Sequence, residues 1–317
     1  MNELALAVFA SETGTHLVNP PVGGRWFAHL RSFDDAAYTA RLGAGGFRFV
    51  GRSSPSFSPL LRSIHDPPPG LFVRGAADLE LLSRPAVAVV GARACSGYGA
   101  SVARMLGREL ARASVVVVSG MARGVDAEAH RGALEAEATT VAVLGCGIDR
   151  DYPAAHAELA RRIVERGLIV SEYAPGVEPA PWRFPARNRI VAGLSAVTVV
   201  VEARERSGAL ITADLALEEG REVFAVPGEI GSALSAGTNG LLKLGASPLT
   251  SAADVLLAFG IEASTAALDD RLLCLLPATA DELVRQTGLS AAEVARALVE
   301  LELAGAAGAS DGVYRVR

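Results

Sequence analysis

Arginine and glycine recur together in short segments of the sequence, each of which directly follows an apolar run. The residues of these segments that could contact a ligand are Arg93, Gly120, Arg123, Gly124, Ser207 and Gly208. Glycine lets a ligand approach the backbone closely, and arginine offers paired N–H donors to phosphate oxygens. Any one segment is better explained as a tight turn, but the whole set predicts binding of a phosphate-bearing ligand.

The segment 182–189 adds aromatic side chains to the arginines. It holds the candidates Trp182, Arg183, Phe184, Arg187, Asn188 and Arg189, and Lys243, the only lysine of the chain, is a further candidate cation. Aromatic faces stack on bases at roughly 1–3 kcal/mol per base, and interleaved arginines neutralise phosphates. This pattern favours a nucleic-acid single strand, because its bases are free to stack. Phe184 fits equally well as a hydrophobic residue packed beneath the segment. We expect a helix to begin at Asn188, so Arg189, inside that helix, is the arginine that best fits a structural role.

The elements that must position these residues alternate between apolar strands and helices. From Ala86 onward, apolar runs such as 86–91, 115–120 and 140–145 are separated by Ala/Leu-rich helical stretches. Strands without polar alternation, separated by helices, predict a parallel sheet that is covered on both faces. We therefore expect an α/β fold with a Rossmann-like, doubly wound, mostly parallel sheet at 75–262. The loops that follow its strands meet at one edge, which would gather the arginines.

Two further regions flank this domain. Residues 1–74 read as largely irregular, with turn clusters, and partly as an extension of the sheet domain. A small polar stretch at 261–270 reads as a linker, and 268–317 reads as three short helices and a terminal strand pair, which indicates a small C-terminal winged-helix domain. That domain holds eight acidic and five basic residues. A protein-contact or regulatory role, or a purely stabilising one, therefore suits it better than reading a DNA groove.

Composition and missing motifs exclude several classes of protein. The chain has 317 residues and 50% hydrophobic content, with a net charge of −5, which argues against both a disordered chain and a histone-like binder. The acidic start and the lack of an 18-residue apolar run predict a cytoplasmic protein with no signal peptide or membrane span. Three scattered cysteines and five unpaired histidines predict no metal site. Arg93 replaces the second glycine of a dinucleotide fingerprint and no Walker motif occurs, so no cofactor is expected.

Three single residues have simple structural interpretations. Cys146 lies between two glycines, and close packing explains it better than nucleophilic chemistry with His130. Asp126 reads as the N-cap of a helix, and His130 as a buried, hydrogen-bonded residue one turn further on.

A series of motifs across residues 50–260 resembles the DNA-processing protein A (DprA/Smf) family. They include SGMARGVDAEAH (119–130), FPARNRIVAGLS (184–195) and VVEARERSGALITA (200–213). The resemblance implies a non-catalytic, cytoplasmic, usually homodimeric protein of DNA recombination and natural transformation, or competence. Such proteins bind and protect incoming single-stranded DNA and load the RecA recombinase, with single-strand-binding protein as a further candidate partner. It also implies that Arg93 grips a phosphate, with Arg183 and Phe184 nearest to the cation and aromatic residue that the family places beside its pocket.

The alternative hypothesis is a nucleotide-processing hydrolase of the related phosphoribohydrolase type. Those enzymes share a PGGxGTxxE motif, whereas the corresponding loop here has Leu241 and Leu242 and lacks the glutamate. Glu229 or Glu202 could act as a general base, but neither has a partner at motif spacing. A scaffold that binds only protein is the third possibility.

Overall fold

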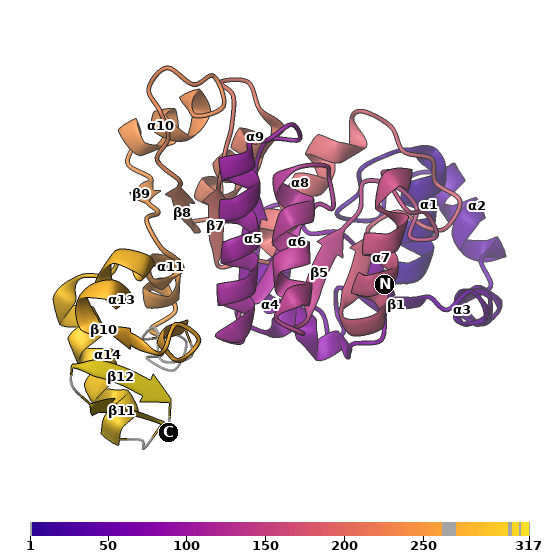
Figure 1. Ribbon diagram of the computed structural model, residues 1–317. Coiled ribbons are helices and arrows are strands. Elements are labelled where there is room, and N and C mark those ends of the chain that lie inside the picture. Colours follow the sequence, from indigo (N-terminus) through magenta and orange to yellow (C-terminus); the bar gives the residue numbers. More distant parts are fainter. Residues whose placement is uncertain (1, 262–270, 304–305, 311, 317) are drawn as a thin grey trace. The chain divides into compact units, whose positions relative to one another are not determined.

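Figure 1 shows the computed structural model, which describes residues 2–261, 271–303, 306–310 and 312–316. The chain forms two compact units, Met1–Gly260 and Ile261–Arg317. The predicted linker at 261–270 and the predicted boundaries at 262 and 268 lie, apart from Ile261, outside the described residues.

The first unit is built around a nine-stranded sheet. Its strands are β1 (Arg48–Gly51), β2 (Gly70–Arg74), β3 (Ala86–Val90), β4 (Val116–Ser119), β5 (Thr140–Val143), β6 (Leu168–Ser171), β7 (Val197–Val200), β8 (Glu222–Ala225) and β9 (Ser247–Pro248). They lie in the order β1-β2-β6-β5-β4-β3-β7-β8-β9. The pairings from β6 to β9 are all parallel, whereas β1 and β2 run antiparallel. The predicted mostly parallel α/β sheet is confirmed.

Helices cover both faces of this sheet. They are α4 (Pro59–Arg62), α5 (Gly97–Arg112), α6 (Val125–Glu135), α7 (Ala157–Arg166), α8 (Arg183–Gly193), α9 (Gly208–Glu218), α10 (Ala236–Lys243) and α11 (Ala252–Ala258). Helices α5, α6 and α7 lie side by side (Figure 1). Successive strand residues point to opposite faces, so Val141 and Val143 face the side covered by α8, while Ala142 faces α6 and α7. No described helix is long and apolar enough to cross a membrane.

The N-terminal region is not irregular, and that expectation is wrong. It forms α1 (Glu3–Thr13), α2 (Gly24–Ser32), α3 (Asp35–Ala44) and the antiparallel strands β1 and β2 at the edge of the sheet. Helix α1 buries residues around most of its circumference, so its sequence has no polar stripe to reveal a helical period. The strands have only four and five residues, too few for a recognisable alternation.

Helix α8 begins at Arg183, five residues before the predicted start at Asn188. Pro185 misled the prediction, because proline usually interrupts a helix. In the first turn a backbone N–H has no intrahelical partner, so a proline there removes no hydrogen bond. The helix therefore carries Phe184, Arg187 and Asn188 on one rigid element rather than on a loop.

The second unit forms a small domain of its own. Its described elements are β10 (Ala278–Thr279), α13 (Ala280–Thr287), α14 (Ala291–Leu303), β11 (Ala307–Ser310) and β12 (Val313–Val316). The three strands pair in the order β10-β12-β11, so the predicted terminal strand pair is present and gains a third strand. Buried Leu283, Val294 and Leu298 form its core. Of the helix predicted at 270–276, residues 271–273 are helical, and Asp270 lies outside the described residues.

Candidate nucleic-acid interface

The order of the strands creates a crevice between β3 and β7. β3 and β7 are neighbours in the sheet. After β3 the chain crosses to β4 on one side of this pair, and after β7 it crosses to β8 on the other side. In doubly wound sheets the loops diverge at such a switch point, and ligands bind there. A cavity of about 330 Å³ lies at this point, lined by residues of the loops after β3, β4 and β7 and by α8 and α9.

Three arginines surround this cavity and face solvent. Arg93 comes from the loop after β3, and Arg204 and Arg206 come from the loop after β7. None of the three forms an ion pair with a carboxylate in the described part of the chain. Unpaired guanidinium groups around a concave site are suited to phosphate, which they bind through two parallel hydrogen bonds.

Phe184 lies within a stack of side chains at the cavity wall. The guanidinium carbon of Arg93 is 5.5 Å from the centre of the Phe184 ring. The ring of Tyr152 stacks on Phe184 with centres 5.2 Å apart. Phe184 therefore orients Arg93, and the half-exposed Tyr152 offers a further aromatic face.

Arg187 lines the cavity but is held by the protein rather than free for a ligand. It is 4% exposed and donates to the backbone oxygens of Val143 and, at 2.8 Å, of Gly120. A Cβ atom on Gly120 would come within 2.5 Å of the Arg187 guanidinium, so a larger residue there would displace this side chain from its bonds. Burial lowers the pKa of Arg187, and the nearby Asp126 opposes this shift.

Asp126 is not the N-cap of α6, and that interpretation is wrong. Gly124 holds the N-cap position, with φ of 74°, and a Cβ there would collide with the backbone oxygen of Ala92. Asp126 lies in the first turn and accepts from the backbone N–H groups of Gly120 and Ala122, at 3.1 and 3.3 Å. It therefore shapes the loop after β4. Burial raises its pKa, and the Arg187 guanidinium and the two backbone donors oppose the rise.

Asn188, Ser207 and Gly208 also line the cavity, where their polar groups fix the loop after β7. The Asn188 amide donates to the Gly208 backbone oxygen at 3.1 Å, which ties α8 to the start of α9. Ser207 caps α9 by accepting from the Ala209 backbone N–H.

The remaining sequence candidates lie outside the cavity lining. Arg123 and Lys243 are exposed, on the loop before α6 and at the end of α10. Arg183 lies 4.8 Å from the Trp182 ring centre and 5.1 Å from that of Tyr173, and it donates to the Glu178 backbone oxygen. These residues could contact only a strand that runs on beyond the cavity.

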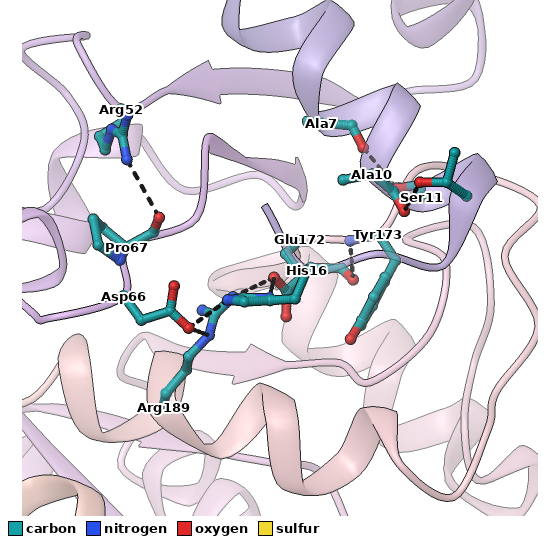
Figure 2. A network of polar contacts seen from close by, with 12 residues as sticks. Ala7, Ala10, Ser11, His16, Arg52, Asp66, Pro67, Glu172, Tyr173 and Arg189 are labelled. Atoms are coloured by element: carbon teal, nitrogen blue, oxygen red, sulfur yellow. Dashed lines mark hydrogen bonds and ion pairs between the residues drawn. The ribbon is translucent and has the colours of Figure 1, made fainter. Parts of the chain in front are cut away.

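Arg189 belongs to a polar network on the far side of α8, in which Arg189 and Glu172 are buried while His16 and Asp66 are partly exposed. Figure 2 shows Arg189 with His16 between the carboxylates of Asp66 and Glu172. It donates to Glu172 at 2.5 Å, its Nε lies 3.4 Å from Asp66, and it is 8% exposed. Burial would raise the pKa of Asp66, but hydrogen bonding from His16 and the charge of Arg189 hold it below its ordinary value. Arg189 is thus occupied within the protein, which agrees with its expected structural character and leaves it unsuited to a DNA contact.

Arg204 and Arg206 line the cavity but are not among the single residues chosen from the sequence, although their segment 204–208 follows an apolar strand and is expected at this edge of the sheet. The missing information was that β7 lies beside β3, which no local pattern encodes. Tyr152, also not a candidate, lies beside the cavity through its stacking on Phe184. Tyr152 is isolated in the sequence from the segment that holds Phe184.

Three of the groups considered for catalysis, Cys146, Glu202 and His130, are buried, whereas Glu229 is exposed. Cys146 is buried, and burial raises its pKa to about 11, as expected for a packing residue. Glu202 accepts from the backbone N–H and the hydroxyl of Ser96, at 2.8 and 2.5 Å, so neither carboxylate oxygen is free for a substrate. His130 is fully buried and hydrogen-bonded to Thr140, as expected. Among the described residues, no group of His, Cys, Asp and Glu is arranged to hold a metal ion.

The fold and the site together define a class, a doubly wound α/β protein with a cationic cavity at its switch point. Within that class, the model of the family DNA recombination-mediator protein A matches residues 48–260, and that of the DprA winged helix domain matches 261–312. The chain belongs to this DprA/Smf family, as its motifs predicted, and its C-terminal unit is a winged-helix domain.

Curated relatives and solved structures agree with this assignment. The DNA processing protein DprA of Streptococcus pneumoniae is 47% identical over 212 residues, which cover 65% of this chain and 74% of the relative. Protein Smf of Escherichia coli is 40% identical over 282 residues, 82% of this chain and 75% of the relative.

Two solved structures also match. That of S. pneumoniae DprA has a TM-score of 0.68 at 39% identity, covering 81% of this chain and 93% of its own. That of Helicobacter pylori DNA processing protein A, studied for its single-stranded DNA binding mode, has a TM-score of 0.61 at 31% identity, covering 68% and 97%.

Proposed function

We propose that this protein is a non-catalytic recombination mediator that binds single-stranded DNA across the cavity between β3 and β7. The observation that supports the proposal is the ring of unpaired Arg93, Arg204 and Arg206 around a cavity with an aromatic wall. Phosphates would lie on the arginines, and bases would enter the cavity or stack at its rim. Single-stranded DNA binding by the H. pylori relative supports the same ligand for this chain.

The two groups of candidate residues have different parts in this proposal. Arg93 and Phe184, with Gly120, Asn188, Ser207 and Gly208, would form the cavity itself. Trp182, Arg183, Arg123 and Lys243 would contact a longer strand outside it. Arg187 would hold the cavity wall in shape through its bonds to the loops after β4 and β5.

Within the cell, the proposed role is to protect incoming DNA and to load RecA onto it during natural transformation. A homodimer in the cytoplasm, with RecA and single-strand-binding protein as partners, completes the proposal. It is supported by membership of the recombination-mediator family. The acidic balance of the winged-helix domain favours a protein contact over a DNA contact for that part.

A titration of matched single-stranded and duplex oligonucleotides at two ionic strengths tests the binding proposal. We expect tighter binding of the single strand, with an affinity that falls steeply as salt rises, because cations displace counterions from phosphates. Equal affinity for both forms, or an affinity that does not respond to salt, would contradict it. Release of free base from AMP or dAMP would instead support the hydrolase alternative.

A further inference from the structure

Helix α2 buries one side chain against the rest of the protein and exposes large apolar side chains to solvent. Trp26 is 4% exposed and packs with Ala5 and Leu6 of α1. Phe27 and Leu30, which are neighbours on the helix surface, are 50% and 38% exposed. Single exposed apolar residues are ordinary, but several on one short element indicate a contact surface.

The turn before α2 adds an apolar side chain that protrudes from the protein. Val22 directly precedes the N-cap residue Gly23 and is 98% exposed. Pro20 and Pro21 come before it and restrict the conformations that the turn can adopt. A side chain exposed to this extent contributes nothing to the folded core, so it is free to enter an apolar phase outside the protein.

The fixed charges of residues 13–33 are all positive. No acidic residue lies between Glu12 and Asp34, although the chain as a whole is acidic. Arg25 and Arg31 of α2 are exposed, and neither forms an ion pair or a side-chain hydrogen bond within the part of the chain that the structure describes. Glu12 lies 3.5 Å from a ring nitrogen of His29 instead. The exposed apolar side chains are therefore accompanied by free cations, which favours a partner that is both apolar and anionic.

The shape of this surface distinguishes between two such partners, an acidic peptide and a lipid bilayer. A peptide is usually received in a groove. In the described part of the chain, neither the cavity between β3 and β7 nor a smaller one of about 20 Å³ beside α1 has a residue of α2 or of the turn in its wall. Val22 and Phe27 protrude instead. Protruding apolar side chains beside arginines fit the interface of a bilayer, where headgroups meet acyl chains.

We propose that α2 and the turn before it form a membrane-surface site that holds the protein reversibly on an anionic bilayer. Val22, Phe27 and Leu30 enter the interfacial region of one leaflet, and Arg25 and Arg31 pair with its anionic headgroups. Three side chains and two charges give weak, reversible binding rather than a stable anchor.

This site is separate from the proposed DNA site. The cavity between β3 and β7 has no residue before Val90 in its lining, so lipid and DNA can be bound at the same time. The use of the site, which is to hold the protein where incoming DNA emerges from a membrane, rests on the proposed function. Lipid binding itself does not rest on it.

Sedimentation of the full chain with vesicles tests the site. Vesicles of phosphatidylcholine and phosphatidylglycerol in equal parts are compared with vesicles of phosphatidylcholine alone. We expect binding to the anionic vesicles that weakens as salt rises, and much weaker binding to the neutral ones. No binding to the anionic vesicles, or equal binding to both, would overturn the proposal.

Two soluble competitors identify the surface that binds the vesicles. An excess of single-stranded oligonucleotide should leave the sedimented fraction unchanged, and displacement would assign the lipid binding to the DNA cavity. Polyglutamate offers charge but no apolar phase, so full displacement by it would assign α2 to an acidic protein segment. If the protein binds vesicles but no oligonucleotide, the proposed DNA function is wrong and the membrane site stands.

Substitutions separate the apolar contribution from the charged one. Val22→Ser and Phe27→Ser should each weaken vesicle binding by about five- to tenfold, because each removes apolar area from the bilayer. The matched control is Val299→Ser on α14, which is 51% exposed and should have no effect. Arg31→Ala should weaken binding by about fivefold at low salt, whereas Arg112→Ala should not.

The affinity for oligonucleotides should stay unchanged in all the α2 variants, which shows that they are folded. Val22→Ser keeps the test decisive even if another variant unfolds, because its side chain is almost fully exposed. Vesicle binding by Val22→Ser that equals binding by Val299→Ser would overturn the assignment.

Discussion

Helix α8 separates two groups of arginines that the protein uses in opposite ways. On the cavity side, Arg93, Arg204 and Arg206 are exposed and have no carboxylate partner within the described residues. On the other side, Arg189 is buried between Asp66 and Glu172 (Figure 2). The sequence around these residues is similarly rich in arginine. The presence of a carboxylate partner, rather than the abundance of arginine, is what distinguishes a structural cation from a candidate ligand contact.

The largest expected difference between the two groups of arginines is in the free energy of unfolding of their alanine variants. Arg189→Ala leaves the buried Glu172 carboxylate without its counter-charge and removes a partner of the partly exposed Asp66, so we expect the free energy of unfolding to fall by about 3–5 kcal/mol. Arg93→Ala should change it by no more than about 0.5 kcal/mol, because the side chain is exposed. Urea unfolding followed by circular dichroism measures both values. Similar losses in the two variants would remove the distinction.

Acid provides a second test, through His130, which is buried between α6 and β5. Burial, with Arg187 and His156 nearby, lowers the pKa of His130 from 6.5 to about 3. Because the unfolded chain takes up the proton first, stability present above pH 6.5 is lost as pH falls towards 3, by up to about 4–5 kcal/mol. Urea midpoints measured between pH 7 and pH 4 should fall steadily. In His130→Gln this slope should be shallower, and an unchanged slope would assign the acid sensitivity to other groups.

DNA affinity tests the other half of the comparison. Arg93→Ala should weaken binding of every single-stranded sequence by about 1.5–3 kcal/mol, the worth of a charged hydrogen bond. The salt slope should become about one unit shallower. Arg112→Ala is the matched control, since Arg112 is also exposed and unpaired in the described chain but ends α5 at the opposite edge of the sheet. An equal effect of both substitutions would mean that total charge, not the cavity, drives binding.

The smallest expected effect concerns Trp182, which lies outside the cavity. Trp182→Ala should leave the affinity for oligonucleotides of a few bases unchanged. It should weaken long ones by about 1 kcal/mol, nearly independently of salt, because stacking does not involve counterions. A series of oligothymidylates of increasing length measures this. A salt-dependent loss would show instead that Trp182 serves to place Arg183.

The core of the fold was predictable because its signal is local. Strands such as β3 and β4 are buried on both faces, and the apolar runs of their sequences record this directly. Arg93 and Gly120, in the loops after these strands, were predicted as site residues and line the cavity. The start of α8 was missed because Pro185 is permitted in a first turn, and β1 was missed because four residues carry too little pattern.

The positions of Arg204 and Arg206 at the cavity cannot be predicted from local sequence patterns alone. Their place at the cavity follows from the pairing of β7 with β3, whose sequences are more than a hundred residues apart. Asp126 shows the same limitation on a smaller scale. An aspartate before a helix normally caps it, but here a glycine with positive φ takes the cap and directs the carboxylate to the loop after β4.

The contact between Ser96 and Glu202 has a consequence for the affinity that the proposed DNA binding would have. It fastens the two loops that diverge at the switch point to each other, one carrying Arg93 and the other Arg204 and Arg206. A single strand bound between them, as we propose, would meet two loops already held at a fixed spacing and would not have to order them. The entropy lost on association would be correspondingly smaller.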